Sequence, residues 1–454
     1  MSKKRIIKFF SLALVLLLAV TALAGCGGGN DKKTETETQT QTQTQPVNLT
    51  VWWWGEQEAP GAQKWMDETV ALYQKEHPNI KIKTVLQSTD QLVPAFKAAA
   101  AAKQGPDIQY FWGGVWTLED AWAGSLVPLN DLIPAEEMKH YINNNERTFD
   151  GKQWGIGWYL SGNAIAYNKD LFNKAGLDPA NPPKTWDEFI AACAKLKKAG
   201  ITPVAAGVKD GWFGGWLWQL LNKQTLDSVD DIKKAAVGES KFTDEKYAQW
   251  WGKLKELKDK GYFNNDVASL DYQQGQDMWL QGKAAMVFGN DTFFPGWIKQ
   301  MGVDKVGIMQ VPVYGTGKMA DTITVTAQGW GVTSWSKQQK EAANFLVFMH
   351  TPDRIKAWYD NTGVLPADDR FDASAVQLPQ MKQMNEWYLT KPSLNMENFI
   401  PSMLEERGIF PGVQLLLSGE KNAKDAAALT EKAIKEWRSS NPAALEKFKN
   451  WIGK

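Results

Sequence analysis

Residues 49–55 read LTVWWWG, a short apolar run stopped by glycine that is typical of a buried parallel strand. Over residues 62–77 the apolar side chains recur at helical spacing, and Pro78 ends that predicted helix. Residues 80–85 alternate between apolar and polar side chains, which predicts a second strand. A strand, a helix and a strand in this order predict a right-handed βαβ unit with a parallel sheet.

The alternation of strands and helices continues along the chain. An Ala-rich helix is expected at 92–104, stopped by Gly105 and Pro106, and a third strand is expected at 107–112. Further segments carry the same signals: strands at 164–167, 203–208 and 284–288, and helices at 186–199, 244–260, 272–281, 338–349, 378–390 and 421–437. Thr185 is the expected N-cap of the helix at 186–199. Because no short-period repeat and no second linker occurs after residue 46, we expect two α/β lobes connected by several strands.

Composition narrows the class of protein. The chain has 454 residues, of which 43% are hydrophobic and 22% are charged, as expected for a globular protein. It carries 51 basic and 51 acidic residues, and this balance argues against a nucleic-acid partner, which requires a basic surplus. The three histidines, His77, His140 and His350, lack metal-ligand spacing, and no cofactor motif occurs, so neither a metal nor a cofactor is expected. The unusual count is 23 tryptophans.

The first 26 residues indicate the compartment. Four basic residues precede an apolar run at 9–20 that is short for a membrane span, which indicates a secretory signal. Residues 23–26 read LAGC and resemble the lipobox cut by a lipoprotein signal peptidase. Residues 1–25 are therefore predicted to be a lipoprotein signal peptide. The predicted location is extracytoplasmic, with the chain anchored to the cell membrane through lipidated Cys26.

A polar, low-complexity segment follows the predicted anchor. Residues 27–46 read GGGNDKKTETETQTQTQTQP and offer nothing to bury, so residues 26–46 are predicted to be the lipidated cysteine and a disordered tether. The only cysteine besides Cys26 is Cys193, so the folded part can form no intramolecular disulfide.

Several short motifs occur in a fixed order along the chain. Besides the lipobox they are GE at 55–56, GPDI at 105–108, YNKDL at 167–171, PKTWDEF at 183–189 and QGKAAM at 281–286. In this order they resemble the extracellular solute-binding lipoproteins of carbohydrate ABC importers, the family 1 group that includes maltose-binding protein. The resemblance runs from about Val47 to Lys454. It implies the α/β, two-lobed type II periplasmic-binding-protein fold, with parallel-sheet lobes joined by a multi-strand hinge.

The resemblance also implies a domain plan and partners. Lobe 1 is expected at 47–160 and 329–375, and lobe 2 at 161–328 and 376–454. The expected ligand is a carbohydrate, more specifically an oligosaccharide, and the expected protein partner is the pair of transmembrane subunits of an ABC permease. A monomer without enzymatic activity is expected.

Candidate ligand contacts follow from where aromatic side chains stand. Sugar rings have apolar faces and hydroxyl-rich edges, and ligands of open α/β sheets bind beyond the carboxyl ends of the strands. The aromatic candidates stand at predicted strand ends, crossings or glycine-interrupted loops: Trp54, Phe111, Trp112, Tyr159, Trp212, Trp216, Phe293 and Trp330. The polar candidates for the hydroxyl edges are Asp90, Asn163, Asp210 and Asp291. Turn or helix-capping roles are the alternative for these four residues.

The family pattern adds three residues to this set. Its acid after the first strand falls on Glu56, with Gln57 in place of a basic neighbour, and its C-terminal aromatic platform falls on Phe410. Two departures from maltose-binding protein stand out: GG at 113–114 replaces an Asp-Arg pair, and NDTF at 290–293 replaces a Gly-Pro-Trp run. A sugar other than maltose is therefore expected.

Two other functions remain open from the sequence. A secreted glycoside hydrolase would share the signal and the aromatic platforms, but would need two carboxyl groups at catalytic separation. A binder of a peptide or another non-sugar solute on the same fold is the second alternative. Peptide capture favours charged residues at strand ends, where this chain places aromatic ones.

Overall fold

A computed structural model describes residues 46–142 and 144–452. The predicted signal peptide, the lipidated Cys26 and the tether up to residue 45 lie outside the described residues and stay predictions. Among the helices that are described, none combines the length and apolarity needed to span a membrane. The described residues belong to one compact unit.

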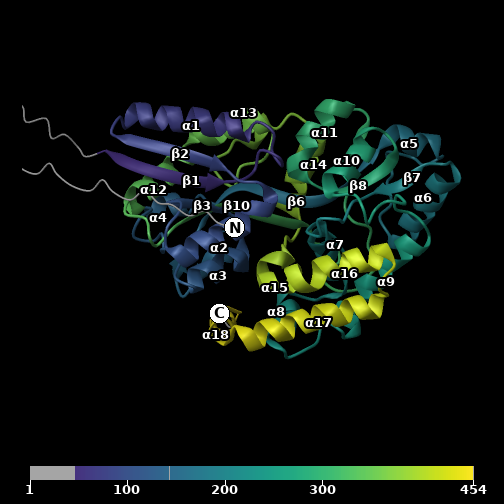
Figure 1. The fold of residues 1–454 in the computed structure, drawn as a ribbon. Helices are drawn as coiled ribbons and strands as arrows, with labels where there is room; N and C mark the ends of the chain where they lie inside the picture. The colour runs from purple at the N-terminus through teal and green to yellow at the C-terminus, as the bar shows by residue number, and fades with distance from the viewer. Residues whose placement is uncertain (1–45, 143, 453–454) are drawn as a thin grey trace, which may run out of the picture. The chain divides into compact units, whose positions relative to one another are not determined.

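The strands form one mixed sheet in the order β2-β1-β3-β10-β6-β8-β7, with β9 also paired to β6 (Figure 1). These strands are β1 (Val47–Trp53), β2 (Ile80–Leu86), β3 (Ile108–Phe111), β6 (Ile156–Asn168), β7 (Thr202–Ala205), β8 (Ala284–Asn290), β9 (Val306–Met309) and β10 (Thr324–Val332). A separate hairpin joins β4 (Thr148–Phe149) to β5 (Lys152–Gln153). The βαβ prediction is confirmed, because β1 pairs in parallel with both β2 and β3.

Two antiparallel strands occupy the middle of the sheet. β10 pairs with β3 on one side and with β6 on the other. β6 is 13 residues long and buried throughout; its first part pairs with β10 and its second part with β8 and β9. The short strand predicted at 164–167 is therefore wrong in extent. The glycines at 155, 157 and 162 hid the longer strand, because glycine weakens a strand pattern in sequence.

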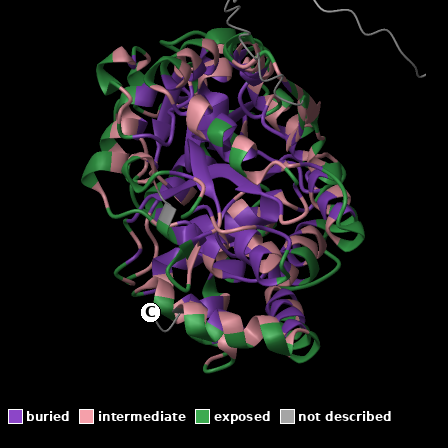
Figure 2. Cartoon of the chain, turned by 90° about the vertical axis from the view of Figure 1, so that its left-hand side faces the viewer, coloured by how far each residue is buried: buried purple, intermediate pink, exposed green. Residues whose placement is uncertain are grey.

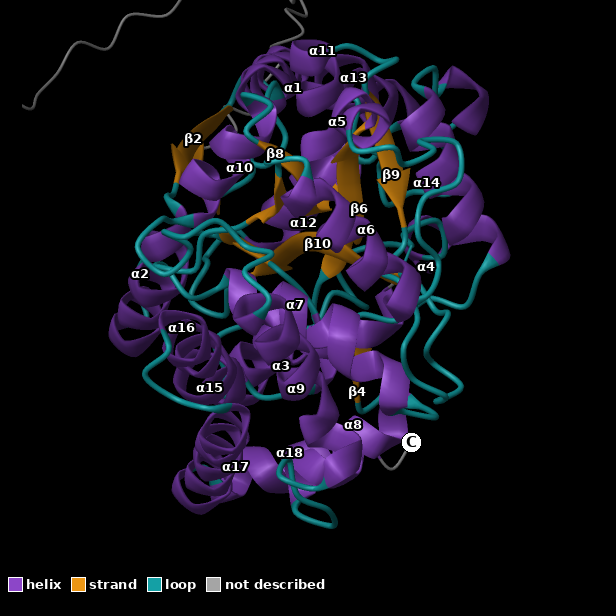
Figure 3. Cartoon of the chain, turned by 90° about the vertical axis from the view of Figure 1, so that its right-hand side faces the viewer, coloured by secondary structure: helices purple, strands orange, loops and turns teal. Residues whose placement is uncertain are grey.

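Helices cover both faces of the sheet (Figures 1 and 3). They are α1 (Ala62–Glu76), α2 (Thr89–Ala102), α3 (Gly114–Trp122), α4 (Ala135–Met138), α5 (Lys169–Lys174), α6 (Trp186–Lys198), α7 (Phe213–Asn222), α8 (Val229–Val237), α9 (Glu245–Asp259), α10 (Tyr272–Leu280), α11 (Phe294–Met301), α12 (Gln339–Met349), α13 (Pro352–Thr362), α14 (Pro379–Thr390), α15 (Ser402–Leu404), α16 (Phe410–Ser418), α17 (Ala423–Ser440) and α18 (Pro442–Ile452). The predicted N-cap of α6 is confirmed: Thr185 Oγ1 accepts from Glu188 N at 3.3 Å, and Glu188 closes a capping box.

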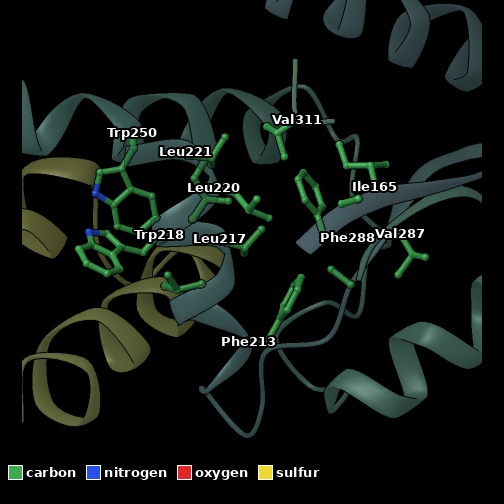
Figure 4. Packing of buried hydrophobic residues seen from close by; sticks show 14 of the residues in the cluster. Ile165, Phe213, Leu217, Trp218, Leu220, Leu221, Trp250, Val287, Phe288 and Val311 are labelled. Carbon is green, nitrogen blue, oxygen red and sulfur yellow. The ribbon is translucent and has the colours of Figure 1, made fainter. Parts of the chain in front are cut away.

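Most of the apolar core falls into two clusters. The first cluster contains buried residues of 49–159 and 330–364, and the second contains buried residues of 115–122, 160–327 and 365–448. Figure 2 shows the buried strands enclosed by exposed outer surfaces, and Figure 4 shows Phe213, Leu217 and Trp218 packed within the second cluster. The apolar face of α3 packs in the second cluster, although the buried residues that precede and follow α3 in sequence belong to the first cluster.

Tryptophan accounts for much of the first cluster. Trp158 lies at its centre, with ring centroids 4.5 Å from Trp358, 4.8 Å from Trp330 and 5.2 Å from Trp65. All four side chains are at most 2% exposed. Large flat rings in mutual contact bury much apolar area, so this group holds β6 and β10 against α1 and α13.

Candidate ligand-binding site

A cleft of about 400 Å³ opens where strands of both clusters end. This volume lies within the range of small-molecule sites. Its first wall comprises Trp54, Thr89, Trp112 and Trp116, and its second wall comprises Trp212, Trp216, Phe293 and Phe410. Its floor comprises Ser161 and Asn163 of β6 and Thr326 and Gln328 of β10. The long central strands therefore carry the base of the cleft.

The first wall contains a row of three indole rings. Trp54 and Trp112 are edge to face with their ring centroids 6.1 Å apart, and Trp112 and Trp116 are edge to face with their ring centroids 5.8 Å apart. Trp54 Nε1 donates to Thr89 Oγ1 at 3.0 Å, which fixes the first ring against α2. Trp112 and Trp116 are half-buried, so part of each ring faces the cleft.

The second wall has the same chemistry on the opposite side of the cleft. Trp212 and Trp216 lie edge to face at 5.2 Å on the first turn of α7 and the residue before it. The ring centroid of Trp216 lies 6.4 Å from that of Phe293. Gly211 has φ of +83°, and a Cβ there would stand 3.2 Å from Phe410 Cβ. Glycine therefore allows the turn before Trp212 to approach α16.

The floor is a hydrogen-bonded polar layer. Ser161 Oγ accepts from Gln328 Nε2 at 2.9 Å and from Asn290 Nδ2 at 2.7 Å. Gln328 Nε2 also reaches Glu58 Oε1 at 3.4 Å. Removal from water raises the pKa of Glu58 to about 7. The layer presents amide and carboxyl groups that can exchange hydrogen bonds with a ligand's hydroxyls.

Acidic side chains dominate the charges of the cleft. Six carboxyl groups line it, against a single basic side chain, Lys97. The acidic residues are Glu58, Asp90, Asp210, Glu397, Glu405 and Glu406. Lys97 Nζ stands 3.7 Å from Glu406 Oε1, so the one cation of this lining is already paired. Because of this excess of carboxyl groups, the cleft disfavours an anionic ligand. Among the described residues, no group of three or more His, Cys, Asp or Glu side chains is arranged to hold a metal ion.

The structure brings ten of the fifteen predicted residues to the cleft. They are Trp54, Gln57, Asp90, Trp112, Asn163, Asp210, Trp212, Trp216, Phe293 and Phe410. Six of these ten are aromatic, and together they supply all of both walls except Thr89 and Trp116. Contact of each with a ligand stays a prediction.

Two of the other five predicted residues have local structural roles. The Glu56 carboxylate accepts from Gly61 N at 3.1 Å and from Gln63 N at 2.6 Å, so it binds the free N–H groups at the start of α1. Phe111 is 7% exposed and meets Phe96 at 5.2 Å, away from the cleft. Successive residues point to opposite sides of an extended chain, so Trp112 reaches the cleft and Phe111 does not.

The remaining three lie beneath the floor. Tyr159 is fully buried, and its hydroxyl donates to Glu58 Oε2 at 3.0 Å. The Asp291 carboxylate accepts from Gly162 N at 2.9 Å and from the Tyr388 hydroxyl at 2.5 Å. Trp330 is fully buried within the tryptophan core. Tyr159 and Trp330 were predicted from their position at expected strand crossings, and Asp291 as a polar residue after a predicted strand. Strands buried on both faces turn most of their side chains into the interior, so we remove all three from the candidate site.

Several residues of the cleft escaped the sequence analysis. The main ones are Glu58, Trp116, Gln219, Gln328, Glu397 and Glu405. Trp116 had a usable signal, because it follows Trp112 at a spacing that places both on one side of a strand-to-helix junction. Glu397 and Glu405 had none. They lie about 280 residues from Trp116 in sequence, and only folding brings Glu405 Oε2 within 2.8 Å of Trp116 Nε1.

The structure explains why glycine stands at positions 113–114. Gly114 has φ of +46°, and a Cβ there would stand 2.4 Å from Asn398 Cα. Any side chain would therefore collide with the 3-10 helix η5 (Met396–Phe399). The departure from the family pattern at these two positions lets η5 pack against the start of α3, where Glu397 and Asn398 of η5 join the lining of the cleft.

Comparison with known proteins agrees with this architecture. Residues 55–354 match the bacterial extracellular solute-binding protein family. A chitin oligosaccharide binding protein of known structure superimposes with a TM-score of 0.78 at 27% identity, over 86% of this chain and 98% of that chain. The fold class expected from the sequence, the two-lobed type II periplasmic-binding-protein fold, is therefore confirmed.

Two relatives are similar in sequence. An uncharacterized ABC transporter extracellular-binding protein of Pyrococcus horikoshii is 29% identical over 289 residues, which span 62% of this chain and 64% of that protein. The sn-glycerol-3-phosphate-binding periplasmic protein of Shigella flexneri is 29% identical over 219 residues, which span 45% of this chain and 47% of that protein. The matched segments thus cover less than two thirds of either relative. The family match itself extends over well more than half of this chain, and the chain belongs to the bacterial extracellular solute-binding proteins.

Proposed function

We propose that this chain is the extracytoplasmic receptor of a carbohydrate ABC importer, and that it binds an oligosaccharide in the cleft between its two aromatic walls. The observation that carries the proposal is the pairing of two indole walls with a polar floor. Sugar rings offer apolar faces to flat aromatic rings and hydroxyl groups to amides and carboxylates, so each surface of the cleft has a matching surface on a sugar.

The size of the aromatic surface favours an oligosaccharide over a single ring. Trp54, Trp112 and Trp116 follow one another along the first wall, and the second wall adds Trp212 and Trp216. One sugar ring covers about one indole ring, so these rows of indole rings offer stacking positions to several sugar rings. The chitin oligosaccharide binding protein that shares this fold supports the same class of ligand.

The strand arrangement supports a hinge mechanism. Among the described strands, β6 and β10 occupy the middle of the sheet, and both carry floor residues of the cleft. A ligand that touches both walls binds better when the walls approach, and its differential affinity shifts the population toward the closed form. We propose that the closed form is the one delivered to the permease. We also propose that the lipid on Cys26 holds the monomeric receptor at the membrane.

The charge of the cleft bears on the alternatives. A phosphate ester, the ligand of the Shigella flexneri relative by its name, would meet six carboxyl groups and one paired lysine. The family whose model matches this chain is one of solute-binding proteins, and the chitin oligosaccharide binding protein that shares its fold is a binder by its name. A non-enzymatic sugar receptor therefore accounts best for the cleft.

A thermal-unfolding screen tests this function. The Cys26→Ser variant would be purified without lipid and heated with mono- and oligosaccharides, each of which is then examined for cleavage by thin-layer chromatography. A ligand at 100 times its Kd adds about 2.7 kcal/mol of stability, which raises the unfolding temperature by a few degrees. A shift with the sugar intact supports the proposal. Cleaved sugar supports the hydrolase, and stabilisation only by non-sugar solutes contradicts a sugar receptor.

A further inference from the structure

Two carboxyl side chains meet where η5 joins the lining of the cleft. Glu397 belongs to η5, and Glu405 begins the π-helical segment η6 (Glu405–Ile409). Their side chains are hydrogen-bonded to each other. A Cβ on Gly215 would stand 2.4 Å from Glu397 Oε1 and 3.1 Å from Glu405 Oε1. The pair therefore lies against the turn of α7 that carries Trp216.

The partners of this pair are neutral. Glu405 Oε2 accepts from Trp116 Nε1 at 2.8 Å, and Glu397 Oε2 accepts from Gln219 Nε2 at 3.2 Å. Within the described part of the chain, neither carboxyl group forms an ion pair with Lys or Arg. Two ionised carboxylates in this position would repel each other without a nearby cation.

Two amide oxygens of the cleft lining lack hydrogen-bond partners. Gln219 is 1% exposed and Asn395 is 4% exposed, and both line the same cleft. Gln219 Oε1 and Asn395 Oδ1 have no partner among the described residues. Gln219 lies against Glu397, and Asn395 lines the same cleft. Buried polar atoms are nearly always satisfied, so these two acceptors outnumber the one unpaired amide donor of the lining, Asn163 Nδ2, and point to a donor group as the missing partner.

We propose that Glu397, Glu405, Gln219 and Asn395 form a subsite for the protonated primary amine of an amino sugar. This inference rests on the proposed function and names the class of sugar. An ammonium group offers three donors where a hydroxyl offers one, and its hydrogen bonds to carboxylates are charge-assisted and stronger. A metal ion is the weaker alternative, because no described set of three acidic, histidine or cysteine side chains is arranged to hold one. An anion would be repelled by the pair.

Binding of an ammonium group at this subsite changes the protonation of the carboxyl pair. Burial raises the pKa of both carboxyl groups, and a neighbouring ammonium charge would lower both again. When the charged amine binds, a proton held by the pair leaves to solvent and the carboxylates accept hydrogen bonds from the ammonium. No covalent bond other than a carboxyl O–H bond is broken.

Other ionisable groups surround the elements that carry the pair. They are Glu406 and Lys97 at the rim, Glu119 and Asp120 on α3, Glu146 beside Asn398, Lys233 on α8 and Glu431 on α17. Substituting glutamine at 397 or 405 leaves all of them in place. A difference between these variants and the wild type therefore reports on the carboxyl pair itself.

Matched sugars test the subsite directly. Glucose, N-acetylglucosamine and glucosamine, with their β-1,4-linked dimers and trimers, differ only in the group at C2. Isothermal titration calorimetry of the Cys26→Ser protein at pH 7, in phosphate and in Tris, gives affinity and proton release together. We expect an amino form to bind about tenfold or more tightly than both neutral forms, with a net release of protons. An amino form that binds no tighter than the neutral forms overturns the subsite.

Variants separate the pair from the rest of the cleft. Glu397→Gln and Glu405→Gln should each reduce affinity for the amino form about tenfold or more, and for neutral forms less than about threefold. Glu436→Gln is the matched control, since it removes a carboxylate that pairs with Arg407 outside the cleft, and it should change neither affinity. Equal losses for amino and neutral sugars would contradict the subsite while leaving a sugar receptor in place. Failure of every sugar to bind would contradict the proposed function itself. If the glutamine variants do not fold, the wild-type comparison of matched sugars still decides the question.

Discussion

Tryptophan performs two different tasks in two neighbouring regions of this protein. In the first cluster, Trp65, Trp158 and Trp358 are at most 2% exposed and pack ring against ring. In the cleft, Trp112 and Trp212 are half-buried and pair edge to face with a neighbouring indole. The same side chain therefore builds a core where its surroundings close on every side, and a ligand surface where one side stays open.

The difference shows that residue type alone does not assign a tryptophan to either task. Trp158 and Trp330 stand on the same central strands as the floor of the cleft, yet both point into the core. Alternation along β6 separates Trp158 from the floor residue Ser161. Trp330 has the same position in the alternation of β10 as the floor residues Thr326 and Gln328, and is core because the rings of Tyr110 and Trp158 cover it. The two regions should respond oppositely to substitution, and four predictions test this contrast.

The largest effect is expected in the core. Trp158→Ala should lower the free energy of unfolding by about 3–5 kcal/mol, because it leaves a large cavity among four aromatic rings. Urea denaturation followed by circular dichroism measures the change. A loss below about 1 kcal/mol would show that the tryptophan core does not stabilise the fold as the packing indicates.

The next effect is expected on ligand affinity. Trp212→Ala should weaken binding of the identified sugar about tenfold or more, because it removes a stacking surface of the second wall. The free energy of unfolding without ligand should change much less than for Trp158→Ala. Titration calorimetry measures the affinity.

A second half-buried tryptophan provides the control for this substitution. Trp387 lies on α14 and does not line the cleft. Trp387→Ala should leave sugar affinity unchanged. If Trp387→Ala and Trp212→Ala weaken binding equally, the cleft walls have no special role in binding.

A smaller effect is expected where a glycine admits η5. Gly114→Ala should cost about 1–3 kcal/mol of stability, because the residue has φ of +46° and its Cβ would overlap the backbone at Asn398. Gly124→Ala is the control: its φ is +78°, but nothing lies within 4 Å of the added Cβ. Chemical denaturation should rank Gly114→Ala as the more harmful change, and the reverse ranking would contradict the tight contact with η5.

The smallest effect is a dependence of stability on pH. Burial raises the pKa of Glu58 and of Asp291 to about 7, from ordinary values near 4. A carboxyl group whose pKa is raised by folding binds its proton more tightly when folded, so its contribution is complete at low pH and is lost between pH 4 and 7. The unfolding temperature should therefore fall by a few degrees from pH 5 to pH 8.

Two groups oppose this trend. Burial lowers the pKa of His350 and lowers the pKa of Lys223 to about 7, which favours the folded state at higher pH over part of this range. Burial also raises the pKa of Asp120 and Glu146 to about 7, so the carboxyl groups outnumber the two bases and the net change should remain a decrease. Glu58→Gln removes one contribution and should flatten the curve of unfolding temperature against pH. A curve that rises in the wild type and keeps its slope in the variant would show that these carboxyl groups are ionised in the fold.

Local patterns predicted most of the secondary structure. β1, α1 and β2 lie within a few residues of their predicted bounds, because hydrophobic spacing and Pro78 act over short distances. The prediction failed in extent at β6, whose glycines interrupt the pattern while its neighbours β10, β8 and β9 supply its hydrogen bonds. Pairing between strands far apart in sequence overrides a weak local signal.

The residues of the candidate site likewise divide into those that local sequence patterns predict and those that they do not. Aromatic residues after strand ends, such as Trp112 and Trp212, could be selected from sequence, because the carboxyl ends of strands meet at one edge of a sheet. Tyr159 was selected at an expected strand crossing and Asp291 after a strand end, and both proved to be buried, since neither position carries information on which side chain points inward. Glu58 was missed because its neighbour Glu56 fits the family pattern and instead binds the start of α1.

Sequence patterns did not predict α3, α7 or α16, which carry residues of the cleft. The sequence by itself determined the fold class, a part of the helices and strands, and the chemical character of the cleft walls. Each of these follows from short-range periodicity, from motifs in a fixed order or from residue type. Only the tertiary structure decided which tryptophans are core and which are walls, and only it brought Glu397 and Glu405 together beside Trp116. Burial and contact between distant segments depend on how strands pair and helices pack. Those interactions act over distances in space that bear no fixed relation to distance along the chain.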